Sequence, residues 1–476
     1  MQGGLEDYQD FLAAYTCIEA SHFPFYSRRQ DTYSFWVLRL SVTHDLSIMK
    51  TDKNQSADAR QFLIVLLLFI FCMLAKAACA NDKKKPTQAQ KDSASTSTTI
   101  LPVKEENSSL KFSGYFDTYF FANLNQPSTR NNLGNSGSAR GFDRFSNQFQ
   151  LGMFLTQINY TNKNVEFVGE VGYGPNIQYA SYGSDFRYKW GTAIANNTYT
   201  AIFIKQAFIK LKATKKLSFV MGQFGTHIGY EFIDAPLNFH YSISNTFNSG
   251  IPFYHVGLKA TYAFNNKISV MGGMVNGTDN INSNNGSLKF IGQVLVTPHE
   301  GLELSLNTIQ GNEANARKSG KDTASYFGVI DFVANYQVNQ KVKLGFWAMY
   351  GSQQGEFQGS TYFPQMRHWS GVSLYTQYKV NNDFIVGTRL EHFDNTSGVR
   401  PLLTNGLGTY VDTFTLTGSF QLSDGALLLK PELRFDSFEK MKGPNGEQMV
   451  QQFADRNGNF TKNTQTTIGM AAILKF

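Results

Sequence analysis

Short and long connections alternate along residues 112–476, between segments whose residues predict β-strands. There are about sixteen such segments, joined by seven tight connections and eight long ones of roughly ten to twenty-five residues. The tight connections are Thr161 to Asn164, Ala213 to Lys216, Asn265-Asn266, Pro298 to Gly301, Asn339-Gln340, Asn381-Asn382 and Ser423 to Gly425. This layout predicts an all-β, transmembrane, antiparallel up-and-down barrel with short periplasmic turns and long extracellular loops.

The strand segments have two distinct faces. In Phe414 to Leu422, large apolar residues and a glycine alternate with Thr, Ser and Gln. A soluble two-sheet sandwich would also alternate, but many of these segments run for about ten to thirteen residues, which is longer than the usual soluble strand and long enough to cross a membrane. We expect strands at 112–124, 148–160, 165–175, 199–212, 217–228, 254–264, 267–276, 287–297, 302–309, 325–338, 341–351, 370–380, 383–394, 411–422, 426–438 and 464–476. Sixteen strands enclose water rather than a packed interior.

The segment before the barrel has the pattern of a secretory signal. Phe62 to Leu74 is an apolar run that follows basic residues and precedes the small-residue motif Ala78-Cys79-Ala80. The run is short for a membrane helix, so residues 49–80 are interpreted as a signal peptide for Sec export. A buried core helix and a lipoprotein signal ending at Cys79 are the alternatives, and Lys76 stands where a lipoprotein signal has an aliphatic residue.

The start of the chain is expected to contribute nothing to the fold. Met49 lies at a normal distance ahead of the apolar run, which suggests that residues 1–48 are an over-extended start. Residues 81–110 are rich in Lys, Ser, Thr, Gln and Asn, so we expect a disordered periplasmic tail. All three cysteines precede residue 81, which leaves the expected barrel without a disulfide or a thiolate site.

The last expected strand, 464–476, ends the chain on an aromatic residue. Ile468, Met470, Ala472, Leu474 and Phe476 share one face, and outer-membrane lipid is an expected partner of the barrel. A terminal Phe476 at the end of such a strand resembles the signal that the barrel assembly machinery reads. The net charge of +7 is spread along the chain without a basic cluster in the barrel, so no nucleic-acid site is expected.

Several motifs resemble a known family. They are Gly222-Gln223-Phe224-Gly225, Gly229-Tyr230-Glu231 through His240-Tyr241-Ser242, Pro252-Phe253-Tyr254-His255, Arg389 to Asp394 and Pro431 to Asp436. Together they resemble the OmpL-like β-barrel porin family of Gram-negative outer membranes, over about residues 111–476. Val256 departs from the family, which more often has Thr there. The resemblance implies a porin-like barrel, with no defined substrate, cofactor or catalytic residue.

The long connection 229–253 carries few charges and many aromatic residues, a composition that is unusual for a surface loop. We hypothesise that it folds into the lumen and narrows the pore, with Glu231, Asp234 and His240 exposed to solutes. The alternative is that it packs over the extracellular rim.

Charged residues also occupy the polar faces of several expected strands. They are expected to form a lumenal charge ladder that tunes selectivity, or else to neutralise one another within the wall. The candidates are Glu166, Glu170, Arg389, Glu391, Glu432, Arg434 and Asp436.

These features predict an outer-membrane porin that passes small hydrophilic solutes by diffusion. The alternative is a surface adhesin or receptor that uses the loops Asn125 to Asn147, Asn176 to Asn197 and Lys440 to Asn463. His240 and Ser242 are two residues apart, but nothing marks a third catalytic member, and the histidines lack metal-ligand spacing, so no enzyme activity is expected. By analogy with barrels of this size we expect a homotrimer.

Overall fold

The computed structural model describes residues 108–180, 202–283, 285–314, 325–358 and 362–476. The expected over-extended start, signal peptide and nearly all of the tail lie outside the described residues, as does most of the 176–197 loop. No helix within the described ranges is long and apolar enough to span a membrane.

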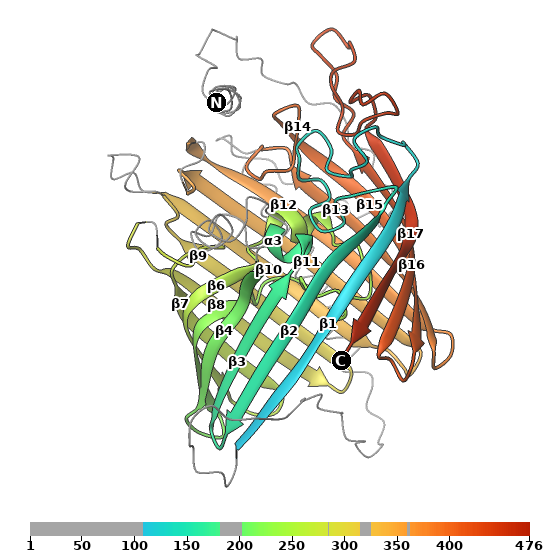
Figure 1. The fold of residues 1–476 in the computed structure, drawn as a ribbon. Coiled ribbons are helices and arrows are strands. Elements are labelled where there is room, and N and C mark those ends of the chain that lie inside the picture. Colours follow the sequence, from blue (N-terminus) through green and yellow to red (C-terminus); the bar gives the residue numbers. More distant parts are fainter. Residues whose placement is uncertain (1–107, 181–201, 284, 315–324, 359–361) are drawn as a thin grey trace, which may run out of the picture. The chain divides into compact units, whose positions relative to one another are not determined.

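Strands dominate the described chain, and two helices of six residues each interrupt its loops (Figure 1). The helices are α3 (Pro175–Ala180) and α5 (Asn245–Gly250). The strands are β1 (Ser108–Asn123), β2 (Phe149–Asn162), β3 (Val165–Tyr173), β4 (Ile202–Lys212), β5 (Leu217–Gly225), β6 (Tyr254–Ala263), β7 (Ile268–Val275), β8 (Lys289–His299), β9 (Leu302–Gly311), β10 (Tyr326–Gln337), β11 (Val342–Gly355), β12 (Phe363–Lys379), β13 (Phe384–Asn395), β14 (Leu403–Thr404), β15 (Leu407–Leu422), β16 (Leu427–Phe438) and β17 (Thr464–Lys475).

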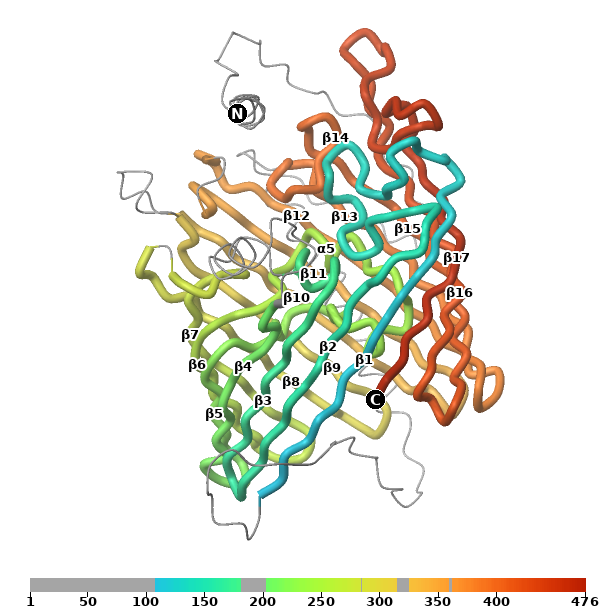
Figure 2. The backbone as a smooth tube through the Cα atoms, viewed as in Figure 1, coloured from blue at the N-terminus to red at the C-terminus, as the bar shows by residue number. Residues whose placement is uncertain are grey.

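The sheet closes on itself. Each strand of the wall pairs antiparallel with its neighbour, with β13 next to β15, and β1 pairs with β17 from Tyr115 opposite Lys475 to Asn123 opposite Thr467. Among the described strands, β14 forms a two-residue hairpin with β15, and the other sixteen make up the barrel. The predicted closed barrel of sixteen antiparallel strands is therefore confirmed. Figure 2 shows the tilted strands in succession around the wall.

The short connections lie at one rim, where β1 begins and β17 ends. Three of them share one construction, in which an asparagine side chain accepts two backbone N–H groups of the turn. Asn265 accepts the backbone N–H groups of Lys267 and Ile268. Asn339 and Asn381 likewise each accept the N–H groups of the residues two and three positions later in the chain. An asparagine that bonds its own turn in this way stabilises a tight reversal, which explains why these connections were visible in the sequence.

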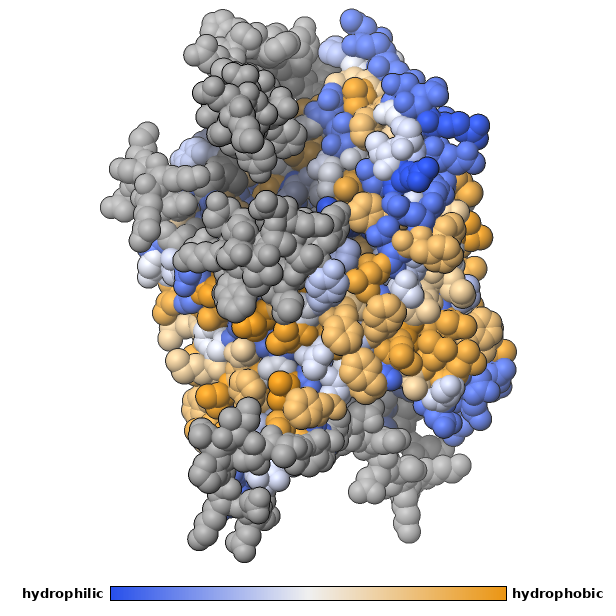
Figure 3. All heavy atoms as spheres, in the orientation of Figure 1, coloured by the Kyte–Doolittle hydropathy of each residue, from blue (hydrophilic) through white to orange (hydrophobic). Residues whose placement is uncertain are grey.

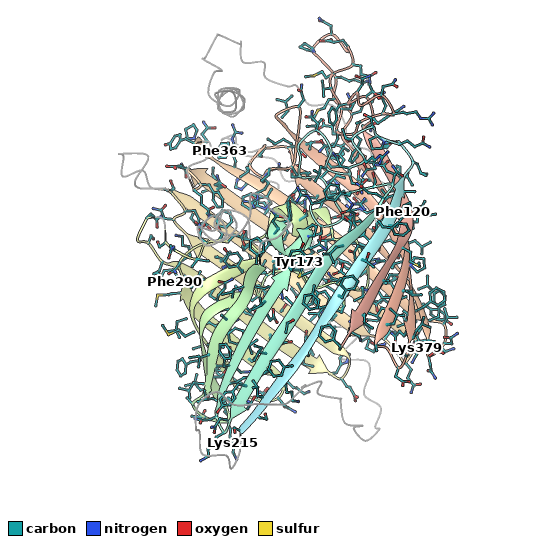
Figure 4. All side chains as sticks on the ribbon, in the orientation of Figure 1. Phe120, Tyr173, Lys215, Phe290, Phe363 and Lys379 are labelled. Atoms are coloured by element: carbon teal, nitrogen blue, oxygen red, sulfur yellow. The ribbon has the colours of Figure 1, made fainter. Side chains whose placement is uncertain are left out.

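The outer face of the barrel is apolar around its middle. Phe154, Leu390, Leu416 and Met470 are among the large apolar side chains exposed on the outside. Figure 3 shows such residues as a broad band that gives way to hydrophilic side chains over the long loops. In Figure 4, Lys215 and Lys379 lie at the short-turn rim, whereas Phe120 and Phe290 lie higher on the wall. A lipid-facing band flanked by polar rims is the pattern of an outer-membrane barrel.

Three strands extend four or more residues farther toward the long-loop rim than the sequence predicted. β11 continues to Gly355, β12 begins at Phe363 and β15 begins at Leu407. Their added residues include Gln365, Arg367 and His368, which break the apolar alternation because this part of the wall need not face lipid. The alternation therefore marks the membrane-crossing length of a strand and not its full paired length.

A charge on the outer face is expected to destabilise the barrel far more than the same charge on the inner face. On β15, Leu416 is exposed on the lipid side, and Gln421 alternates to the lumen side near the short-turn rim. Leu416→Arg should lower the free energy of unfolding in vesicles by about 2–4 kcal/mol, and Gln421→Arg by less than about 1 kcal/mol. Urea titration of both variants tests this; equal losses would contradict the assignment of faces.

Candidate pore and the 226–253 loop

The connection between β5 and β6, residues 226–253, bonds to inward-facing side chains around much of the barrel wall. Its irregular backbone needs hydrogen-bond partners, because a buried and unpaired amide or carbonyl group is costly. Acidic side chains of the wall accept from its amides. Glu432 on β16 accepts the N–H groups of Tyr241 at 2.8 Å and Ser242 at 3.1 Å. Glu391 on β13 accepts those of Asn245 and Thr246, at the start of α5.

Basic side chains of the same strands donate to the carbonyls of the loop. Arg389 donates to Ser242 O at 2.7 Å, and Arg434 to Ile243 O at 2.6 Å. Lys430 donates to the carbonyls of Ala235 and Asn238. Charge-assisted hydrogen bonds of this kind are about twice as strong as neutral ones. The wall of β13 and β16 thus binds both kinds of backbone group in the loop.

The three loop residues singled out from the sequence make specific contacts with the wall. Glu231 bonds to Arg389 at 2.6 Å and accepts the N–H of Ser244. Asp234 lies 2.7 Å from Lys205 on β4 and accepts from Tyr115 on β1. His240 lies 2.7 Å from the hydroxyl of Thr417 on β15.

These three side chains are 6%, 8% and 3% exposed. Glu231, Asp234 and His240 are therefore mostly buried, contrary to the expectation that they are exposed, although Glu231 and His240 belong to the lining of the cavity described below. Their polar atoms face wall side chains of opposite or complementary character instead of solvent.

The predicted charges of the strands face inward, and all but Glu166 are buried. Of the seven predicted charges, only Arg434 and Asp436 form an ion pair with each other, at 2.8 Å. The others bond mostly to the 226–253 loop or to charged residues outside the predicted set. Asp436 also pairs with Arg140 of the β1–β2 connection at 2.9 Å. Glu170 pairs with Lys205 at 2.7 Å, and the half-buried Glu166 with Lys210 at 3.2 Å.

The candidate charges predicted from the sequence did not include Lys205, Lys430, Asp117 and Arg140. The first three lie at polar positions of alternating strands, so a complete list of such positions would have included them. Asp117 accepts from the hydroxyl of Tyr241 at 2.6 Å. Arg140 lies in a long connection, where no periodicity marks an inward residue.

The opposite side of the loop is apolar. Phe247, Ile251 and Phe253 pack in one buried cluster with inward residues of the wall, among them Trp347 and Trp369. The polar edge of each tryptophan is bonded, because Trp347 donates to Asp331 and Trp369 donates to Gly250 O at 2.8 Å. Burying such aromatic surface stabilises the loop against β10–β13, on the order of 2 kcal/mol per large side chain.

Two glycines of the wall allow this close packing. A Cβ at Gly345 on β11 would come within 2.3 Å of the Tyr230 hydroxyl oxygen, and one at Gly371 on β12 within 2.4 Å of the Thr246 methyl. With Gly345 in place, the ring of Tyr230 stacks on that of Tyr375, with 4.0 Å between centroids. No feature of the sequence distinguished these glycines from the others in the strands.

Other long connections pack on the 226–253 loop from the long-loop side. Asn248 donates to the carbonyl of Ser138, and Phe142 contacts the rings of Phe247 and Phe253. Arg400, between β13 and β15, donates to Ser249 O at 2.7 Å and lies over the ring of Trp369. The 226–253 loop is thus held between the strands and the β1–β2 and β13–β15 connections.

A cavity of about 670 Å³ lies between the loop and strands β8–β12. Its wall includes Thr297 and Gly301 at the short-turn rim and Thr226 and His227 at the end of β5. The loop contributes the segments Gly229 to Phe232 and Leu237 to His240. Over the described ranges, no group of three or more His, Cys, Asp or Glu residues is placed to hold a metal ion.

The chain is similar to several solved outer-membrane proteins. OmpT of Vibrio cholerae is similar over 78% of this chain and 100% of its own, at 11% identity and a TM-score of 0.47. The outer membrane channel DcaP of Acinetobacter baumannii matches 78% of this chain and 99% of its own (8% identity, TM-score 0.49). The anion-selective porin from Comamonas acidovorans matches 78% and 100% (12% identity, TM-score 0.49). These likenesses are too distant to bear on solute or mechanism.

No curated protein matches the chain in sequence. A model of a protein family does match it. Together with this match, the closed barrel, its lipid-facing band and its partly filled interior define the class of protein as an outer-membrane porin. The chain belongs to the family described as "Putative beta-barrel porin-2, OmpL-like", whose model matches residues 109–476. The family resemblance inferred from the sequence motifs is therefore confirmed.

Removing one acidic side chain of the wall should loosen the loop. Glu432→Ala leaves the amides of Tyr241 and Ser242 without their acceptor, at a cost of about 3 kcal/mol. Hydrogen exchange at residues 239–246 should then accelerate by roughly a hundredfold. Glu300→Ala, which removes an exposed acid from a short turn, is the control and should change nothing. Unchanged protection in Glu432→Ala would mean that the acid does not hold the loop.

The loop should also open more readily as pH falls. Burial, together with the cations of Arg389, Lys430 and Arg434, lowers the pKa of His240 well below its ordinary value. An opened loop restores an ordinary pKa of about 6.5, so protons favour the open form below that pH, by up to about tenfold per pH unit. Exchange at residues 238–242, corrected for intrinsic rates, should rise between pH 7 and 5 in the parent and not in His240→Gln. The same rise in both would assign the effect to another group.

Proposed function

We propose that this protein lets small hydrophilic solutes diffuse across the outer membrane through a water-filled lumen that the 226–253 loop narrows. The observation that carries the proposal is the division of the interior. Beside β13–β16 and β1, the loop is bonded directly to the wall. Other parts of the loop pack on β10–β12, but a cavity of about 670 Å³ lies between strands β8–β12 and the loop segments Gly229 to Phe232 and Leu237 to His240. In this proposal solutes pass on the cavity side, and the bonded side sets the width of the pore.

The inward charges then act mainly through the loop. Glu231, Asp234, Arg389, Glu391, Glu432 and Arg434 are engaged in ion pairs or hydrogen bonds, so few of them remain to attract passing ions. We propose that their role is to fix the constriction, and that selectivity arises from the groups that line the cavity. His240 belongs to the constriction as a neutral hydrogen-bonding group.

A second candidate function is surface binding through the long loops. The β16–β17 connection favours it, because isolated bridges between Lys442 and Gln448 and between Phe453 and Lys462 give it regular structure beyond the strands (Figure 1). A barrel that acts only through this surface needs no permeable lumen, so conductance separates the two functions.

The route to the membrane and the assembly state complete the proposal. We expect Sec export, insertion by the barrel assembly machinery through Phe476, and a homotrimer. Phe476 is 59% exposed and stacks on Phe154, and its backbone pairs with Gly114, so its ring is accessible on the outer face at the barrel seam.

Shortening the loop tests the proposed constriction. Deleting Asp234 to Asn248 should raise the single-channel conductance of the refolded barrel in a planar bilayer by several-fold, because a porin lumen of sixteen strands is wide without its loop. A deletion of Gly443 to Glu447, at the tip of the β16–β17 connection, is the control. An unchanged step in a heat-modifiable, folded deletion variant would contradict a constricting role, and the absence of any conductance in the parent would favour surface binding.

A further inference from the structure

The cavity between the loop and β8–β12 has a wall of unusual chemistry. Its polar side chains are mainly amides and hydroxyls from neighbouring strands. They are Gln293, Thr297, Ser305, Asn335, Gln337 and Gln377. Each amide offers both donors and an acceptor, which lets it bond a hydroxyl group in either direction. Within the described residues, no side-chain hydrogen bond is found for Asn335 or Gln377, so both amides are free to bond a solute.

The charges around this cavity cancel. Glu231 is paired with Arg389 at 2.6 Å, and Glu303 and Lys343 line the same wall with opposite signs. The two histidines of the wall add no charge near neutral pH, because burial lowers the pKa of His227 to about 4 and that of His240 well below its ordinary value. A wall without net charge gives no electrostatic advantage to either anions or cations.

The loop presents apolar side chains to the same cavity. Phe232 is 50% exposed and Leu237 is 61% exposed, although most of the loop around them is buried. Asn238 accepts the N–H of Phe232 at 2.9 Å and donates to its carbonyl, which fixes the backbone that carries the ring. An exposed aromatic ring on a fixed backbone is a stacking platform beside the amide wall.

We propose that this cavity is a saccharide-selective passage, which binds neutral di- or trisaccharides weakly as they cross. The proposal rests on the diffusion function and names its solute class. A sugar ring has an apolar C–H face that packs on an aromatic side chain, and its hydroxyls, each both donor and acceptor, match an amide wall. The volume of about 670 Å³ falls within the range of small-molecule sites. Because Glu303 and Lys343 line the wall with opposite signs, neither an anion nor a cation gains a net counter-charge there.

The test uses the full refolded barrel in planar bilayers and in liposomes. Conductance in potassium chloride first shows whether a pore exists. A neutral disaccharide such as maltose should then block the current in a saturable manner and enter liposomes at least several-fold faster than a polyethylene glycol of matched hydrodynamic radius. Uridine and glutamate serve as an aromatic and a charged solute for comparison, and neither should block as well.

Two variants locate the effect. Phe232→Ala should weaken disaccharide block on the order of fivefold and leave potassium chloride conductance within about twofold. Asn335→Ala should weaken disaccharide block to a smaller extent, and it provides an independent test of the site if Phe232→Ala folds poorly. Phe290→Ala, which removes a ring from the outer face at 65% exposure, is the matched control and should leave block unchanged.

The outcomes separate the two proposals. A conducting channel that treats maltose and the polymer alike, or that prefers uridine or glutamate, overturns the saccharide proposal and leaves the diffusion function standing. Selective block that Phe232→Ala does not alter places the saccharide elsewhere and overturns this site. A folded barrel without conductance overturns the diffusion function itself.

Discussion

The backbone of the 226–253 loop imposes the main constraint on this barrel. A segment with little regular structure that lies against other residues must find partners for its N–H and C=O groups, or it will not stay there. Here the partners are charged side chains of the wall, with Glu391 and Glu432 accepting and Arg389, Arg434 and Lys430 donating. The unusual density of buried charge on β13 and β16 follows from this requirement.

The two sides of the loop are held to the wall by different interactions. On the β13–β16 side, charged groups lose their hydration, and ion pairs and hydrogen bonds to other residues replace it. Because these bonds do little more than offset the cost of desolvation, they fix the position of the loop and add little net stability. Near β10–β13, the aromatic residues supply the apolar burial that offsets the entropy of ordering the loop. The side chains of Phe232 and Leu237, which face the cavity, take part in neither contact and stay exposed. The same fold thus leaves one face of the loop free for solutes.

The barrel could be predicted closely from the sequence because its signals are local. Period-two alternation marks each membrane crossing, and asparagines such as Asn339 and Asn381 mark the tight turns. Strand ends on the long-loop side were missed where the wall leaves the lipid, as in β12. The inward charges were recognised as a set, but their partners were not, because Glu432 and Tyr241 lie far apart in sequence and nothing local joins them. The exposure of Glu231, Asp234 and His240 was misjudged for the same reason.

The unequal interior is the central claim, and substituted cysteines test it most directly, since the sequence has no cysteine after Cys79. Gln377→Cys lies on the cavity wall, and Thr415→Cys lies on β15, where the parent side chain is fully buried and accepts from Arg389. A membrane-impermeant, bulky thiol reagent should react quickly with Gln377→Cys and lower the single-channel current in discrete steps, while Thr415→Cys stays unreactive. Equal reaction at both positions, or modification of Gln377→Cys without a fall in current, would contradict this division of the lumen.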